Sequence, residues 1–326
     1  MAVRAELVDP SAVRIVSRHE EAALDLAGSL PRLLVAARRA SATVVHGLHG
    51  RRRAGVGENF WQFRRFTTGD APGRIDWRRS ARDEHLYVRE QEWEAAHTVW
   101  IWIDRSRSMA FRSSLAPVPK IERAVVLGLA LADLLVRGGE RVGLLGVSRP
   151  TASRLATERL AQALAYAPDD GGHLPPATAP IARLAEAVVI GDLLAPEEEI
   201  AAAVAGLAGR GGRGHLVMIA DPAEETFPFW GRTEFVDPDG GLRLVAGRAE
   251  EWRAGYEERL ARHRAAVAGI ARRHGWSFII HRTDRPATEA LLGLHAQLGE
   301  AERWGLAAAR PAVLQFFASA SSSSRD

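Results

Sequence analysis

Short apolar segments alternate with longer helical patterns from Thr98 onward, and this alternation limits the fold more than any other feature of the chain. Residues 99–103 form a continuous apolar run, which is typical of a strand buried on both faces. Residues 120–137 are apolar nearly all round and stop at two glycines, as expected of a buried helix. Further strands are expected at residues 141–147, 187–190, 216–220 and 276–280. The pattern predicts an α/β fold with a doubly wound, mostly parallel sheet.

The rest of the chain follows other patterns. Residues 10–40 are expected to be helical, whereas residues 41–97 carry short apolar runs broken by glycines, which predicts a small β-rich subdomain ending in a strand at 88–94. Residues 227–247 are expected to form a hairpin insertion, and the serine-rich end from Ser319 a disordered tail. We therefore expect three parts: residues 1–97, 98–300 and 301–326.

Composition excludes several classes of site. The 326 residues include no cysteine, so disulfides and cysteine-based zinc sites are ruled out. The formal net charge is only +3, and acidic and basic residues are interspersed, whereas a nucleic-acid binder usually has a concentrated basic face, so we do not expect a nucleic-acid partner. Of the 43 basic residues, Lys120 is the single lysine. Because no apolar run reaches the roughly 20 residues needed to cross a bilayer and no signal peptide is evident, we expect a cytoplasmic protein without membrane insertion.

Oxygen-bearing side chains follow two of the expected strands. Asp104, Ser106 and Ser108 come directly after the first strand, and Asp192 comes directly after the third. Ligands of such sheets bind beyond the carboxyl ends of the strands, so these side chains are candidates for one shared site. Hard oxygen ligands suit Mg²⁺ or Mn²⁺. The alternative is that each aspartate only caps the helix that follows it.

Several short motifs resemble the domain of unknown function 58 family over residues 45–245. They are Gly69-Asp70, Arg74-Ile75-Asp76-Trp77, Ser80-Ala81-Arg82 and Val88-Arg89-Glu90, followed by the Asp-x-Ser-x-Ser-Met strand end and, later, by Asp221-Pro222 with Glu224 and an insertion at 231–241. The resemblance implies a von Willebrand factor A-like fold with a metal-ion-dependent adhesion site. It also implies association with a MoxR-type AAA+ ATPase or its client protein, as an adaptor or co-chaperone.

By the same resemblance, Asp104, Ser106 and Ser108 match the metal loop and Asp192 matches the later metal-site aspartate. The chain departs from the family in lacking N-terminal membrane helices, and Gly171-Gly172-His173 stands where Gly-Gly-Thr is expected, with Thr178 as a possible substitute. Arg105 and Arg107 fill the spacer positions of the loop. They weaken the divalent cation site if they point inward, and favour an acidic partner if they point outward. The Mg²⁺ or Mn²⁺ ion is therefore weakly bound or lost.

Three functions remain open at this level. The first is a non-enzymatic, metal-assisted protein-interaction module. The second is a metal-dependent hydrolase at the same strand ends, although no general base is evident beside Asp104. The third is a nucleic-acid binder that uses the arginine-aromatic segment of residues 51–66. The charged signature residues around Trp77 are interpreted either as a network that fixes the β-rich subdomain to the core or as a docking surface. The chain has no phosphate-binding loop, so it is not itself an ATPase.

Overall fold

The computed structural model describes residues 31–44, 60–67, 75–82, 84–91, 97–167, 172–176, 181, 185–209, 212–238 and 242–298. These residues fall into two compact units, one within residues 48–97 and one within residues 1–47 and 98–326. The domain boundaries expected at residues 97 and 300 stay a prediction. Among the described helices, none is both long and apolar enough to cross a membrane.

The smaller unit contains an antiparallel strand pair, β1 (Phe60–Arg65) and β2 (Tyr87–Gln91), with the short helix α2 (Trp77–Ser80) between them in sequence. Asp76 caps α2 by accepting a hydrogen bond from the Arg79 amide. The Ser80 hydroxyl accepts a bond from the Tyr87 amide at 2.9 Å and so ties α2 to the start of β2. Two signature residues thus have local structural roles. Residues 51–59, 68–74 and 92–96 lie outside the described residues, and with them much of the arginine-aromatic segment and Asp70 and Arg74.

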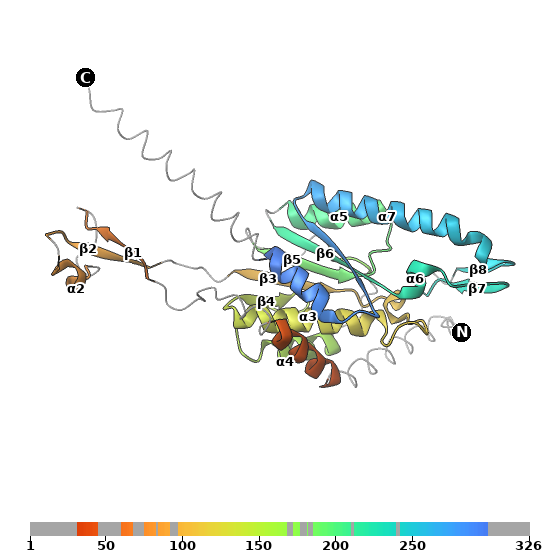
Figure 1. The fold of residues 1–326 in the computed structure, drawn as a ribbon, viewed down its shortest axis with the longest axis horizontal. Helices are drawn as coiled ribbons and strands as arrows, with labels where there is room; N and C mark the ends of the chain where they lie inside the picture. Colours follow the sequence, from red (N-terminus) through yellow and green to blue (C-terminus); the bar gives the residue numbers. More distant parts are fainter. Residues whose placement is uncertain are drawn as a thin grey trace, which may run out of the picture. The chain divides into compact units, whose positions relative to one another are not determined.

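The larger unit is built on a five-stranded parallel sheet (Figure 1). Its strands, in spatial order, are β4 (Arg141–Leu144), β3 (Thr98–Ile103), β5 (Glu186–Gly191), β6 (Arg213–Ala220) and β9 (Ser277–Arg282). The chain moves from β3 to one edge of the sheet and then returns to β5 on the other side of β3. The point at which the strand order reverses therefore lies between β3 and β5. The doubly wound parallel sheet expected from the sequence is confirmed.

Helices cover both faces of this sheet (Figure 1). One face packs against α3 (Lys120–Arg137), α4 (Ala156–Tyr166) and the helical residues 31–44 and 287–298. The other face packs against α5 (Glu197–Ala208) and α7 (Arg253–Arg273). Strand β3 serves both layers: Val99, Ile101 and Ile103 enter the first core, and Trp100 and Trp102 pack against the second. Two-sided burial explains why its sequence is apolar without a break.

An insertion follows β6 and confirms the expected hairpin. The short helix α6 (Pro222–Thr226) leads into the antiparallel strands β7 (Thr233–Val236) and β8 (Arg243–Ala246), and the 3₁₀ helix η3 (Ala249–Trp252) leads into α7. The strand expected at 141–147 is shorter than predicted. It ends at Leu144 because a turn follows, in which Gly146 adopts a φ of 76° that favours glycine.

The start of β6 offers a test of how tightly the second core is packed. A β-carbon at Gly214 would lie 2.6 Å from three ring atoms of Trp276, whose buried indole also donates a hydrogen bond to the Gly212 carbonyl. Because a rigid ring cannot yield cheaply, we expect Gly214→Ala to lower the free energy of unfolding by about 1–3 kcal/mol in urea denaturation.

The matched control is Gly269→Ala within α7, where the nearest atom to the added β-carbon is an arginine nitrogen at 3.6 Å. That change is expected to leave stability unchanged or to raise it by up to about 1 kcal/mol, because alanine favours helix over glycine. Equal effects of the two substitutions would contradict the packing described for Trp276.

Candidate functional site

Asp104 and Asp192 end adjacent strands at the point where the strand order reverses. Asp104 follows β3 and Asp192 follows β5, and the Asp104 amide donates to the Ile190 carbonyl at 2.8 Å. Parallel neighbouring strands bring their carboxyl ends to the same edge of the sheet, so both carboxylates meet there. Both side chains are buried, at 0% and 3% exposure.

The two serines of the loop connect these carboxylates through hydrogen bonds. The Ser106 amide donates to Asp104 Oδ1 at 2.8 Å. The hydroxyls of Ser106 and Ser108 lie 3.0 Å apart, and the Ser108 hydroxyl donates to Asp192 Oδ2 at 2.6 Å. The structure therefore brings together all four residues that the sequence singled out. The 3₁₀ helix η2 (Arg107–Ala110), which begins right after Ser106, provides the tight turn that aims both hydroxyls the same way.

The backbone beside Asp192 is adapted to this close approach. A β-carbon at Gly191 would lie 2.8 Å from the Asp104 β-carbon and 3.0 Å from Asp104 Oδ2, so glycine leaves room for the carboxylate. Leu193, on the other side of Asp192, adopts a φ of 51°, a conformation that leucine rarely takes. Its burial and a 2.7 Å hydrogen bond between His263 Nε2 and its carbonyl hold it there. Strained backbone that is held in place in this way is concentrated at functional sites.

Lys120, the first residue of α3, is the main feature that the sequence did not reveal. Its ammonium donates to Asp192 Oδ2 at 3.0 Å and to Glu224 Oε1 at 2.8 Å, and the side chain is 1% exposed. Glu224 in turn accepts a bond from the Asp221 amide and completes the capping box of α6. Being the only lysine among 43 basic residues was the one signal that could have marked it.

The charges of the site are unevenly compensated. Burial dominates the shift at Asp104 and, together with the nearby Asp192 carboxylate, raises its pKa to about 7. Burial also acts on Asp192, but the Lys120 ammonium and the Ser108 hydroxyl outweigh it and hold the pKa of Asp192 below its usual value. Among the described residues, Asp104 Oδ2 is buried and has no hydrogen-bond partner. One carboxylate is thus paired, and its neighbour lacks a cation.

This donor set fits a divalent cation such as Mg²⁺ or Mn²⁺. Two carboxylates and two hydroxyls are hard oxygen ligands, and the unpartnered oxygen of Asp104 is the atom that an ion would satisfy. No cluster of three or more histidine, cysteine, aspartate or glutamate ligands occurs among the described residues, so the hydroxyls of Ser106 and Ser108 have to complete the set. Lys120 competes with the ion for Asp192.

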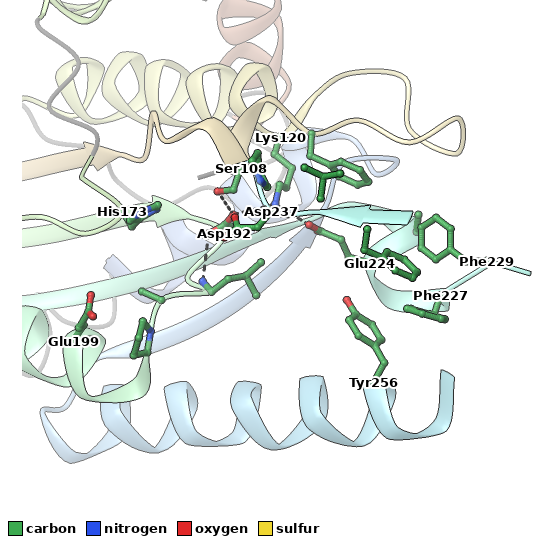
Figure 2. A pocket seen from close by; sticks show the side chains of 18 residues that line it. Ser108, Lys120, His173, Asp192, Glu199, Glu224, Phe227, Phe229, Asp237 and Tyr256 are labelled. Atoms are coloured by element: carbon green, nitrogen blue, oxygen red, sulfur yellow. Dashed lines mark hydrogen bonds and ion pairs between the residues drawn. The ribbon is translucent and has the colours of Figure 1, made fainter. Parts of the chain in front are cut away.

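The structure describes two of the positions at which the sequence departs from the family pattern, Arg105 and His173. The Arg105 guanidinium donates to the Ala167 carbonyl at 2.9 Å, so this spacer side chain is bound to the segment after α4. His173, at the position expected to carry threonine, lines the same cavity as Ser108 and Asp192 (Figure 2). Thr178 lies outside the described residues. The partner-binding roles expected of Arg105 and Arg107 stay a prediction.

A cavity of about 670 Å³ opens from these strand ends (Figure 2). Ser108, Lys120 and Asp192 lie at one end, and further lining comes from the start of α5, from α6 and from the β7–β8 hairpin. The volume lies within the usual range for ligand sites, about 300–1,000 Å³. The polar residues Ser108, Lys120 and Asp192 therefore line one end of a cavity that a ligand can enter from the surface.

The raised pKa of Asp104 predicts a pH dependence in chelator-treated protein. The folded state holds the Asp104 proton more tightly than the unfolded chain does. The contribution of this carboxyl to the free energy of unfolding is therefore fully present below about pH 4 and is lost as the pH rises toward 7. We expect the stability of Asp104→Asn relative to wild type to grow by about 2–3 kcal/mol between pH 5 and pH 8, measured by urea denaturation. A difference that does not change with pH would show that Asp104 is ionised throughout this range.

Removal of the buried ammonium predicts a large loss of stability. Lys120→Met leaves Asp192 and Glu224 without their shared cation, and we expect the free energy of unfolding to fall by about 3–5 kcal/mol at neutral pH. Arg262→Met is the control, because its ion pair with Glu258 is exposed and should contribute little. Similar effects of the two changes would mean that the Lys120 bridge is not a structural element of the site.

The chain is similar to proteins of one family. The family model described as "Protein of unknown function DUF58" matches residues 62–266. "Uncharacterized protein Mb1516" of Mycobacterium bovis and "Uncharacterized protein Rv1480" of Mycobacterium tuberculosis are each 26% identical over 278 residues, covering 80% of this chain and 86% of theirs.

Similar solved structures include BatB from Bacteroides thetaiotaomicron, with 15% identity and a TM-score of 0.37 over 63% of this chain and all of that one. Another is the SpRpn10 VWA domain, with 9% identity and a TM-score of 0.30 over 60% of this chain and 94% of that one. The family model covers more than half of the sequence. The chain therefore belongs to the family of proteins of unknown function DUF58.

Proposed function

We propose that this chain is a non-enzymatic protein-interaction module whose docking point is a divalent cation held by Asp104, Ser106, Ser108 and Asp192. The observation that carries the proposal is the unpartnered, buried oxygen of Asp104 within a continuous hydrogen-bonded set of oxygen ligands. When bound, Mg²⁺ or Mn²⁺ supplies positive charge and an open coordination position for a carboxylate of the partner. The residues of the chain hold that ion and exclude water from one side of it.

The preferred partner is a MoxR-type AAA+ ATPase or its client protein, in the cytoplasm. Membership of the DUF58 family supports this choice, since the resemblance to that family implies association with such ATPases. The open cavity beside Ser108 and Asp192 supports docking of a partner side chain. The chain would act as an adaptor or co-chaperone and leave ATP hydrolysis to its partner.

Hydrolysis at the same strand ends is the second candidate, and His173 is the observation in its favour. This imidazole lines the cavity and lies near enough to Asp104 to lower the pKa of that carboxyl electrostatically. A general base close to a metal-bound water is what such an enzyme needs. Turnover of p-nitrophenyl phosphate with Mn²⁺, lost in His173→Ala, would favour the enzyme over the docking module.

Calorimetric titration with Mg²⁺ and Mn²⁺ tests the ion site directly. We expect wild type to bind one ion, and Asp104→Ala and the double variant Ser106→Ala, Ser108→Ala to bind at least about tenfold more weakly, because each removes oxygen ligands. Asp284→Ala is the matched control, since Asp284 also follows a strand of this sheet but bonds Arg282 instead. Unchanged affinity in the Asp104 and serine variants would contradict the proposal.

Partner binding needs a separate experiment that does not depend on a chelator, because the ATPase itself uses Mg²⁺. A purified MoxR-type ATPase would be captured on immobilised wild type, Asp104→Ala or Asp284→Ala at constant Mg²⁺. Capture by wild type and Asp284→Ala but not by Asp104→Ala supports metal-assisted docking. Equal capture by all three would rule it out.

A further inference from the structure

The cavity beside the ion ligands has a second, apolar end. Figure 2 shows Ser108, Lys120 and Asp192 at the strand ends, with Phe227, Phe229 and Tyr256 away from them. Eight of the twelve remaining lining residues are apolar, and the other four are His173, Glu199, Glu224 and Asp237. One continuous space therefore joins Ser108 and Asp192, two of the four proposed cation ligands, to an aromatic wall.

The aromatic wall is a packed structure. Phe227 lies at the centre of a cluster in which its ring centroid is 5.2 Å from Phe229, 5.6 Å from Phe235 and 4.8 Å from Tyr256. Rings at these separations stabilise one another beyond the area they bury. The cluster joins the β7–β8 hairpin to α7 at this end of the cavity.

Backbone strain marks both ends of the same cavity. Leu193 and Phe227 are the two non-glycine residues with positive φ among those that the structure describes, at 51° and 43°. Phe227 lines the cavity, and Leu193 lies between Asp192 and Leu194, which both line it. Unfavourable conformations that are held by surrounding packing concentrate at ligand sites. Phe227 also ends α6, where a left-handed residue is common, so the strain at Leu193 carries more weight for a ligand site than that at Phe227.

The rim of the cavity is also apolar. Leu194 and Val236 both line it and are each 49% exposed. Exposed apolar side chains that continue a pocket of this kind are typical of a surface that a partner covers. The carboxylates of Glu199 and Asp237 lie on the same lining, so a further acidic residue in the partner is disfavoured there.

We propose that this cavity is a specificity pocket for a partner segment in which a large apolar side chain neighbours the carboxylate that reaches the cation. This inference rests on the proposed docking function and names the chemistry of the partner. The carboxylate occupies the polar end, and the apolar side chain fills the aromatic end and displaces water from it. A volume of about 670 Å³ accommodates both side chains in one segment.

Capped dipeptides provide the probes. N-acetyl-Asp-Phe-amide, N-acetyl-Asp-Gly-amide and N-acetyl-Asp-Arg-amide are titrated into the full chain in Mg²⁺ and followed by nuclear magnetic resonance shifts. We expect the phenylalanine peptide to bind about tenfold more tightly than the glycine peptide, because its side chain is largely buried. Equal binding of these two, no binding of the phenylalanine peptide up to its solubility limit, or stronger binding of the arginine peptide would overturn the proposal.

Variants locate the preference in the cavity. Phe229→Ala removes part of the wall and should reduce the preference for phenylalanine over glycine to below about threefold. Trp252→Ala is the matched control: it removes another ring of the same cluster, stacked on Phe235 at 6.0 Å, that does not line the cavity. Val236→Ser, at an exposed rim position, should weaken the preference even if Phe229→Ala fails to fold. Loss of the preference only in Trp252→Ala, or in none of the variants, would contradict the assignment.

A fourth peptide separates this inference from the proposed function. N-acetyl-Asn-Phe-amide retains the aromatic side chain but lacks the carboxylate. If it binds as well as the aspartyl peptide while the preference for phenylalanine persists, metal-assisted docking is wrong and the apolar pocket stands. If the aspartyl peptides need Mg²⁺ but show no preference for phenylalanine, the docking function stands and the specificity pocket does not.

Discussion

The structure of the candidate site depends on the carboxylates of Asp104 and Asp192, which are buried side by side where β3 and β5 end. Desolvation makes each charge costly, and their mutual repulsion adds to that cost. The chain compensates one of them fully: Asp192 receives the Lys120 ammonium, the Ser108 hydroxyl and the Leu194 amide. Asp104 is hydrogen-bonded by Ser106, and its Oδ2 has no hydrogen-bond partner among the described residues. A fold that keeps such an imbalance in its interior has a place where a cation or a proton is strongly favoured.

The residues around Asp104 and Asp192 keep these two carboxylates close together. Gly191 lets the Asp104 side chain approach β5, and the strained Leu193 sets the direction in which the chain leaves Asp192. Lys120 extends the compensation to Glu224 and thereby joins the strand ends to α6. Because α6 leads to Phe227 and the aromatic cluster, the polar and apolar ends of the cavity belong to one connected structure. The proposed ion binding and the proposed recognition of an apolar side chain would therefore be adjacent functions of one pocket.

The sequence predicted much of the fold, for identifiable reasons. The uninterrupted apolar run of β3 and the helices between later strands were sufficient for the parallel sheet, since few folds bury such strands on both faces. Asp104, Ser106, Ser108 and Asp192 could be chosen because strand ends converge in such a sheet. Their hydrogen-bonded contact is observed, whereas the ion itself stays a prediction.

Features created by tertiary packing could not be predicted. Lys120 lies sixteen positions after Asp104, and its reach to both Asp192 and Glu224 depends on how α3 starts relative to two other strand ends. The aromatic wall combines residues from the α6 end, β7 and α7, which no periodicity links. The early end of β4 could not be predicted either, because the turn at Gly146 is flanked by apolar residues that continue the strand pattern.

The decisive measurement is anomalous diffraction from crystals soaked in Mn²⁺. The account predicts one strong anomalous peak among the oxygens of Asp104, Ser106, Ser108 and Asp192, at coordination distances of about 2.0–2.3 Å. It also predicts that the Lys120 ammonium keeps its contact with Glu224 while its contact with Asp192 lengthens. Absence of a peak at saturating Mn²⁺, with Lys120 still bonded to Asp192, would contradict the cation site.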